Sequence, residues 1–241
     1  MEKIVSIIAA AGKSARMGGA DKLFAPILGR PLIYHTLAPF FEAGCFAAVA
    51  LVLDNPRAPE NRRRTKDLLD SLPVEPRIVT CEGGATRCAS VMNGLRALEE
   101  FDPKIVVVHD GARPVITAQD LIAVAGCARE HGAASFALPA ADTLVGVAPG
   151  EPRKYLQRDN VFHLQTPQAF RFDLLTRACG KIDVTDPMMT DDTAVVAALG
   201  VEAKLITGRA SNLKVTVPDD LRAVEALLAA PGWTRGGGGR R

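Results

Sequence analysis

The 241-residue chain carries almost no net charge and no cluster of basic residues. Its formal net charge is +2, and its lysines and arginines are scattered along the sequence. A nucleic-acid-binding protein usually has a basic patch or stripe. We therefore expect no nucleic-acid partner, and we expect small acidic molecules to be the ligands.

Long apolar runs and paired cysteines are also missing from the sequence. No apolar run reaches the ~18 residues that a bilayer span needs, and the run that begins at Ile4 lacks the charged region and cleavage site of a signal peptide. The five cysteines are odd in number and never spaced C-x-x-C, which argues against a disulfide framework and a zinc site. We expect a cytoplasmic protein without membrane contact, whose cysteines are reduced and buried.

Short apolar runs alternate with segments of helical spacing, which is the pattern of a parallel sheet covered on both faces. This alternation predicts a doubly wound, mostly parallel α/β fold in one domain, residues 1–230. Strands are expected at 4–11, 47–53, 105–109 and 134–138. Helices are expected at 31–42, 86–101 and 218–228, with Thr86 and Thr117 as N-caps.

Two segments depart from this rhythm. Residues 139–167 contain short alternating pieces around the turn-rich stretch APGEPRK, which predicts a projecting β-hairpin. A two-stranded hairpin is not stable alone, so a partner subunit is the expected packing surface. The tail, residues 231–241, is glycine-rich and is predicted to be disordered.

The stretch AAAGKS follows the first predicted strand and ends as a Walker A loop does. That loop needs a second glycine five residues before Gly12, where this chain has Ile7, so a P-loop kinase is disfavoured. Cationic residues nonetheless gather after the strand, with Arg16 and Lys22 following Lys13. Open α/β sheets bind ligands at the carboxyl ends of their strands, so this loop is expected to hold phosphates rather than to be only a solvated surface.

Three further stretches combine glycine, charge and a strand end. In HDGARP, Asp110 and Arg113 lie where a nucleotide's metal and phosphates would be, although Asp110 could simply pair with Arg113; His109 is expected to be packed. In CEGGATRCASV, two glycines before a helix offer backbone amides, a weak signal alone. In the short strand-like LKVTV, Lys214 is a charge in an apolar run and needs a partner unless its ammonium group reaches water.

Taken together, these stretches resemble the 2-C-methyl-D-erythritol 4-phosphate cytidylyltransferase family. The resemblance runs from about Lys3 to Leu228 and rests on IVSIIAAAGKSARMG with Lys22, HDGARP, LQTPQAF, TDDTA and GRASNLKVTVPDDL, in that order. It implies a reaction in which CTP and a polyol phosphate give a CDP-alcohol and pyrophosphate, with Mg²⁺ or another divalent cation. It also implies a homodimer whose hairpin arms embrace.

The resemblance assigns roles to individual positions. Arg16 and Lys22 look like the groups that stabilise the pentavalent phosphorus, and Arg158 and Lys214 like the pair that holds the substrate phosphate. The positions that look like the CTP site are Ala10, Ala11, Gly12, Gly83, Gly84, Ser90 and Asp110. Those that look like the substrate side are Arg113, Thr143, Arg158, Thr166 and Lys214, and Asp110 is the residue expected near the metal.

The chain departs from the family pattern at three places, and two other functions compete with this one. Ser14 replaces a usual glycine, Asp21 and Leu23 flank the lysine, and Ala85 replaces a frequent acid, but no reacting group is lost. The related ribitol 5-phosphate cytidylyltransferases share the fold and most motifs, and HDGARP favours the erythritol substrate. A non-catalytic nucleotide-binding protein would be expected to lack the charged groups that this chain has.

Overall fold

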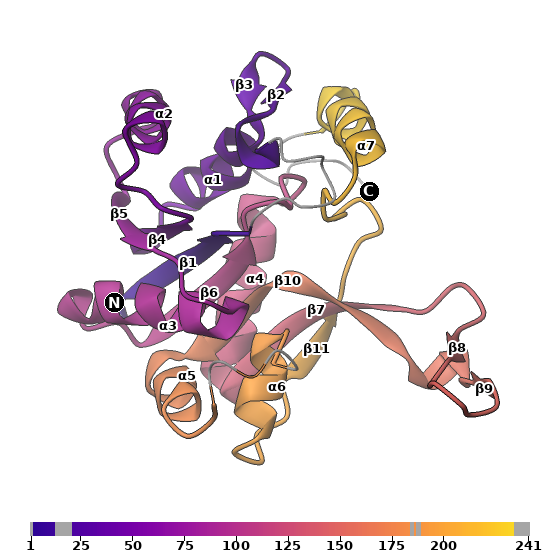
Figure 1. Cartoon of the computed structure of the whole chain (residues 1–241). Coiled ribbons are helices and arrows are strands. Elements are labelled where there is room, and N and C mark those ends of the chain that lie inside the picture. The colour runs from indigo at the N-terminus through magenta and orange to yellow at the C-terminus, as the bar shows by residue number, and fades with distance from the viewer. Residues whose placement is uncertain (1, 13–20, 184–185, 187–188, 234–241) are drawn as a thin grey trace.

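The structure of the chain, a computed structural model, describes residues 2–12, 21–183, 186 and 189–233. Its centre is a seven-stranded sheet with the strand order β11-β7-β10-β6-β1-β4-β5 (Figure 1). The strands are β1 (Ile4–Ala10), β4 (Phe46–Leu53), β5 (Arg77–Glu82), β6 (Ile105–Asp110), β7 (Ala133–Pro139), β10 (Phe162–Arg171) and β11 (Lys204–Thr207). All neighbours pair in parallel except β10, which is antiparallel to β6 and β7.

Helices cover both faces of this sheet, as Figure 1 shows. One face packs against α1 (Leu32–Glu42), α2 (Pro59–Asp70), α4 (Ala118–His131) and α7 (Pro218–Ala229), and the other against α3 (Arg87–Leu98), α5 (Phe172–Cys179) and α6 (Asp192–Ala197). Along β1, Ile8 belongs to the first core and Ile7 to the second. A strand buried on both faces needs apolar residues at every position, which explains the continuous runs in the sequence.

The doubly wound fold is confirmed, with small shifts at the ends of the predicted strands. The predicted helices correspond to α1, to α3 with the following 3₁₀ turn Glu99–Phe101, and to α7. Thr86 accepts a hydrogen bond from the N–H of Ala89, and Thr117 forms a capping box with Asp120, so both predicted N-caps are present. None of the helices in the described residues has the length and apolar character of a membrane span.

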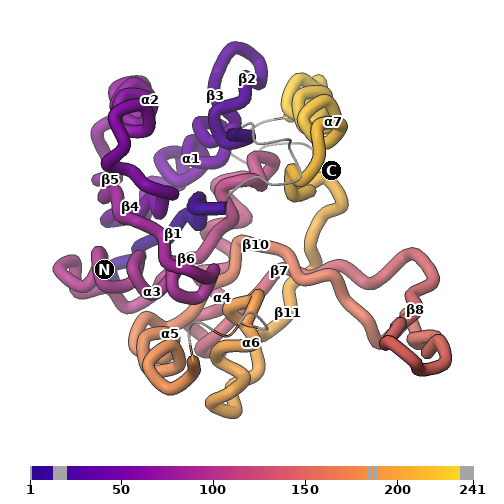
Figure 2. Tube along the Cα trace, viewed as in Figure 1, coloured from indigo at the N-terminus to yellow at the C-terminus, as the bar shows by residue number. Residues whose placement is uncertain are grey.

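A long excursion leaves the sheet between β7 and β10 (Figure 2). The pairing of β7 with β10 ends at Pro139 and Phe162. Between these two residues the chain forms a second, short antiparallel pair, β8 (Val145–Gly146) and β9 (Lys154–Tyr155). We call residues 139–162 the arm. Its apolar side chains are unusually exposed, with Val147 at 74% and Tyr155 at 70% of their maximal exposure.

Three local expectations need correction. Residues 213–217, the LKVTV stretch, form no strand, because Val215 is held by a single bond from its N–H to the Ala112 carbonyl instead of by a ladder. Cys45 is exposed, whereas Cys88 and Cys179 are buried, and all five cysteines are free thiols. Trp233 packs against the core, contrary to the predicted disordered tail, of which residues 234–241 lie outside the described part.

Candidate nucleotide-binding site

A cavity of about 550 Å³ lies at the carboxyl ends of β1 and β6. This is the edge where open α/β sheets bind ligands. Lysines stand on its wall together with one carboxylate of the central sheet and a glycine-rich loop. The residues that line it are Ala9, Ala10, Ala11, Gly12, Lys22, Leu23, Asp54, Gly83, Gly84, Ala85, Thr86, Arg87, Ser90, Asp110, Ala112 and Lys214.

Asp110, the last residue of β6, is the electrostatic centre of the cavity wall. Its carboxylate lies 2.9 Å from Lys214 Nζ, 3.3 Å from Arg113 Nε and 3.5 Å from Arg87 Nε. Burial alone would favour the neutral acid, but these three cations outweigh it and hold the pKa of Asp110 well below its usual range. Asp110 is therefore ionised, and it is the partner that the charge of Lys214 requires.

A second buried carboxylate supports Arg87 from the opposite side. Asp192, at the start of α6, lies 2.6 Å from Arg87 Nη1 and is only 1% exposed. The guanidinium thus bridges two carboxylates on β6 and α6, and their charges raise the pKa of Arg87 although burial opposes its charged form. Since Arg87 is the first residue of α3, this bridge fixes the helix against the cavity edge.

The backbone of Asp110 is held by a chain of buried hydrogen bonds. Thr166 Oγ accepts the Asp110 N–H at 3.0 Å, so the hydroxyl hydrogen is left for His109 Nδ1, also at 3.0 Å. His109 Nε2 then carries the ring hydrogen and donates to the Arg113 carbonyl at 2.9 Å. Burial lowers the pKa of His109 to about 4, which keeps this ring neutral and the chain intact near pH 7.

Lys22 reaches the cavity from the 3₁₀ turn Lys22–Phe24. Its Nζ donates to the Val215 carbonyl at 2.8 Å, next to Lys214 in the sequence. The side chain of Asp21 caps this turn by accepting from the N–H of Leu23. Two lysines from opposite ends of the chain are therefore fixed on one wall.

The glycine-rich loop, which also lines the cavity, packs with close backbone contacts. A Cβ on Gly83 would lie 2.3 Å from Ala11 Cβ, and one on Gly84 would lie 2.4 Å from Ala89 Cβ, so neither position has room for a side chain. Ser90 Oγ accepts the N–H of Gly84 at 3.0 Å and donates to the Thr86 carbonyl at 2.9 Å. The serine hydroxyl thus holds this loop in place, and the Gly84 N–H is already used in a hydrogen bond to it.

Most of the residues expected at the CTP and catalytic positions meet at this cavity. Those on its wall are Ala10, Ala11, Gly12, Lys22, Gly83, Gly84, Ser90, Asp110 and Lys214. Arg113 does not line the cavity but pairs with Asp110, which does, and Thr166 is buried and binds the backbone of Asp110. Thr143 and Arg158 lie exposed on the arm, where Arg158 Nη1 donates to the Ala141 carbonyl at 3.4 Å. Arg16, Lys13 and Ser14 lie outside the described residues.

Sequence reasoning missed the roles of Asp54 and Asp192. Asp54 follows β4 and stands on the cavity wall, and its position at a strand end was the available signal. Asp192 lies in the TDDTA motif but supports Arg87 from far along the chain. No local pattern indicates that pairing.

The carboxylates in and near this site are too few for a metal centre made by the protein alone. Within the described ranges, no group of three His, Cys, Asp or Glu residues could hold a metal ion. Both oxygens of the Asp110 carboxylate face cationic side chains, so Asp110 alone would supply few ligands to a metal ion. That arrangement fits Mg²⁺, which usually binds one or two carboxylates together with substrate phosphates and water.

The fold and the cavity define the class of protein as a nucleotide-binding α/β enzyme domain with a cationic, glycine-bounded site. The sequence model of the family IspD, 2-C-methyl-D-erythritol 4-phosphate cytidylyltransferase, matches residues 4–230. The chain belongs to this family, whose members are nucleotidyltransferases.

Relatives and solved structures agree with this assignment. The chain is 36% identical over 228 residues to the 2-C-methyl-D-erythritol 4-phosphate cytidylyltransferase of Dehalococcoides mccartyi, covering 94% of this chain and 96% of that one. It is 39% identical over 231 residues to a bifunctional IspD/IspF enzyme of Desulforudis audaxviator, covering 95% of this chain but 57% of that protein. The crystal structure of the Thermus thermophilus cytidylyltransferase superposes with a TM-score of 0.71 at 33% identity, over 95% and 100% of the two chains.

Proposed function

We propose that this chain transfers the CMP group of CTP to 2-C-methyl-D-erythritol 4-phosphate, a step of non-mevalonate isoprenoid synthesis. The products are 4-diphosphocytidyl-2-C-methyl-D-erythritol and pyrophosphate. Family membership supports the proposal. The observation that carries it is the convergence of two lysines on one cavity, because Val215 holds Lys22 and Asp110 holds Lys214 where a triphosphate can lie.

The reaction needs no nucleophile from the protein. An oxygen of the substrate phosphate attacks the α-phosphorus of CTP, and the bond from that phosphorus to the oxygen that bridges to the β-phosphate breaks. The bonding electrons leave with pyrophosphate. A phosphate monoester is already largely dianionic near pH 7, so the enzyme contributes orientation and positive charge.

The proposed role of Lys22, with Arg16, is to stabilise the negative charge that grows on the α-phosphate. The Lys22 ammonium is fixed before the reaction by its bond to Val215, which is the preorganisation that electrostatic catalysis requires. The assignment of Arg16 rests on the family resemblance. Lys214 belongs with the substrate phosphate, and its pairing with Asp110 aims it into the cavity.

The base is proposed to be cytosine, read mainly through backbone groups of small residues. The wall that would contact it is made of Ala10, Ala11, Gly12, Gly83, Gly84 and Ser90. This pocket is proposed to be too tight for a purine. On the substrate side, the remaining proposed contacts are Arg113, Thr143, Arg158 and Thr166.

Mg²⁺ or another divalent cation is proposed as the cofactor. When bound, it would neutralise phosphate charge, and Asp110 with the CTP phosphates would hold it. The protein groups retain their own tasks: Lys22 and Lys214 bind and orient phosphates, and Arg87 keeps the Asp110 carboxylate in place.

A homodimer through the arm is proposed because the arm exposes apolar side chains that a single chain does not cover. Val147 and Tyr155 are among the most exposed large apolar residues, and such surfaces usually mark an interface. Arg158 lies on the same arm and carries the planar fork suited to a phosphate. Two exchanged arms would then bring Arg158 of one protomer to the site of its partner. A cytoplasmic location stays a prediction.

Pyrophosphate release tests the function directly. The protein is incubated with CTP, Mg²⁺ and either 2-C-methyl-D-erythritol 4-phosphate or ribitol 5-phosphate, and pyrophosphate is measured. We expect rapid release with the erythritol substrate and little with ribitol 5-phosphate. Faster turnover of ribitol 5-phosphate would reassign the substrate, and production of CDP in place of pyrophosphate would reassign the reaction.

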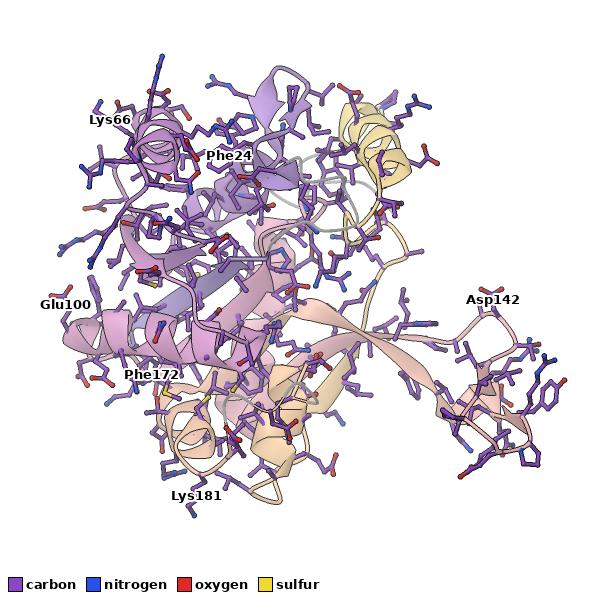
Figure 3. The ribbon with its side chains drawn as sticks, in the orientation of Figure 1. Phe24, Lys66, Glu100, Asp142, Phe172 and Lys181 are labelled. Carbon is purple, nitrogen blue, oxygen red and sulfur yellow. The ribbon has the colours of Figure 1, made fainter. Side chains whose placement is uncertain are left out.

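The Lys22→Ala variant tests the catalytic assignment. Loss of one preorganised donor to the transition state should lower kcat by ~10² to 10³, with a smaller change in the KM for CTP. Lys181→Ala is the matched control, since Lys181 is exposed beside α5, away from the cavity (Figure 3). An unchanged kcat with a raised KM would mean that Lys22 only binds CTP.

Mixing two inactive variants tests the shared site. Arg158→Ala and Lys214→Ala protomers are combined under conditions that allow subunit exchange. If Arg158 serves the partner's site, each heterodimer has one intact site and one site with both defects, so random mixing should restore up to about a quarter of the activity per site. Absence of recovery despite demonstrated exchange would place Arg158 in the site of its own subunit.

A further inference from the structure

A second cavity, of about 510 Å³, lies between α2 and β5, beside the nucleotide-binding cavity. Its volume is within the range of sites for small ligands. Three cationic side chains line it, Arg57, Arg62 and Lys66, together with Thr65 and Thr80. Figure 3 shows Lys66 on α2, and none of the residues proposed to act in the reaction lines this cavity.

The charges in the second cavity do not cancel. Lys66 pairs with Asp70 at 2.6 Å, one turn further along α2. Among the described residues, neither Arg57 nor Arg62 has an ion-pair partner. Glu82 is the remaining carboxylate on the wall, so two unpaired guanidinium groups face one negative charge.

Several residues of α2 that line the second cavity lie on one face of the helix. Arg62, Lys66 and Leu69 recur at the spacing of one helical face, and Arg63 lies outside the lining. Thr65, on the same side, is only 6% exposed, and its Oγ has no hydrogen-bond partner in the described part of the chain. A buried hydroxyl without a partner is unusual in a folded protein.

Two stretches of the chain, residues 54–57 and 82–83, contribute residues to both cavities. Asp54 and Gly83 line the first cavity, whereas Arg57 and Glu82 line the second. The segments are joined because the Gly83 N–H donates to the Leu53 carbonyl at 2.9 Å. The two cavities are therefore distinct but share one wall.

We propose that the second cavity is a binding site for the phosphate group of a small phosphorylated metabolite. Arg57 and Arg62 supply planar donors that match phosphate oxygens, and arginine is well suited to this task. The hydroxyl of Thr65 becomes available if the side chain rotates toward the ligand. Pro56 and Leu69 give the cavity an apolar wall for the organic part of the molecule.

Titration calorimetry with inorganic phosphate tests the site in the full-length protein. CTP is present at saturating concentration without the alcohol substrate, so that the nucleotide part of the first cavity is filled and no turnover occurs; phosphate bound beside Lys214 would be unaffected by changes at Arg57 or Arg62. We expect saturable binding by the wild type and about tenfold or greater weakening in both Arg62→Gln and Arg57→Gln, since hydrogen bonds to charged groups are at the strong end of the range.

Arg63→Gln is the matched control, because it removes the same charge from the same helix outside the cavity. It should bind phosphate as the wild type does. Equal weakening by Arg63→Gln, no effect of Arg62→Gln, or no saturable binding by the wild type would each overturn the proposal. Thermal unfolding of each variant checks that it is folded, and a tungstate soak of crystals should give a heavy-atom peak between Arg57 and Arg62.

This test is independent of the proposed function. It measures phosphate binding and not catalysis, so failure of the cytidylyltransferase assay would leave its outcome unchanged. A tungstate peak only at Lys22 and Lys214 would assign the anion affinity to the nucleotide-binding cavity and overturn the second site.

Discussion

Replacement of His109 should flatten the dependence of the protein's stability on pH. In the folded chain His109 is fully buried and neutral, with Nδ1 accepting from Thr166 and Nε2 donating to the Arg113 carbonyl. Protonation would place a charge in a fully buried position and remove the acceptor that Thr166 uses; Arg113 and Lys214 also oppose the charge, while Asp110 favours it. The folded state therefore resists a proton that the unfolded chain takes up readily.

The size of this effect follows from the pKa values. Burial lowers the pKa of His109 from its ordinary 6.5 to about 4. Above pH 6.5 the ring is neutral in both states and contributes no pH dependence. Below pH 6.5 the unfolded chain binds the additional proton, so the free energy of unfolding falls as the pH falls, by about 1.4 kcal/mol for each pH unit until about pH 4. The full interval corresponds to roughly 3 kcal/mol.

Urea unfolding at a series of pH values between 8 and 4 measures this contribution. His109→Asn keeps an acceptor near Nδ1 but cannot titrate, so it should be less stable than the wild type at pH 8 and should lose less stability on acidification. The exposed histidine at the end of α4 supplies the control, and His131→Asn should keep the wild-type slope. If the free energy of unfolding fell equally with pH in the wild type and in His109→Asn, the conclusion that His109 is buried and neutral would be refuted.

Three further substitutions test packing and charge by urea unfolding. Arg87→Met should lower the free energy of unfolding by ~3 to 5 kcal/mol, because it leaves Asp192 buried without its cation, and adding Asp192→Asn should recover part of the loss. Gly94→Ala should cost ~1 to 3 kcal/mol, because its Cβ would lie 2.7 Å from a methyl group of Ile7. Gly126→Ala, on the exposed side of α4 with nothing within 4 Å of the new Cβ, should instead stabilise by ~0.5 to 1 kcal/mol. A lower free energy of unfolding in Gly126→Ala would contradict the open space at that position. An unchanged free energy of unfolding in Arg87→Met or Gly94→Ala would contradict the contacts described for that residue.

The inner parallel strands β1, β4, β6 and β7 could be predicted because burial on both faces leaves a plain signal in the sequence. The edge strands β5 and β11, which are mostly half-buried or exposed, were not predicted. The strand β10 left no such signal, since its centre carries Gln165, Thr166 and Gln168, all of them buried. Their partners are distant in sequence: Gln168 Nε2 donates to Asp191, and Gln165 Nε2 donates to the Arg209 carbonyl. A buried polar strand is recognisable only after the groups that satisfy it are known.

The need of Lys214 for a partner was predictable, but the conformation around it was not. The alternation in LKVTV resembles a strand because Val215 is fully buried while its neighbours are not. In the structure the Val215 N–H binds the Ala112 carbonyl and its own carbonyl receives Lys22. The segment is thus a junction between two cavity-lining lysines, and single tertiary contacts of this kind have no periodicity to detect.

The overall charge of the chain also conceals how the site works. A net charge of +2 over 241 residues indicates no affinity for a polyanion. Around Asp110, however, three cations gather against two buried carboxylates, and Lys22 stands on the same wall. Asp110 and Asp192 each hold cations in fixed positions, and the group as a whole remains positive. Because charges act more strongly where water is excluded, this small local excess can bind phosphates that the average composition would not attract.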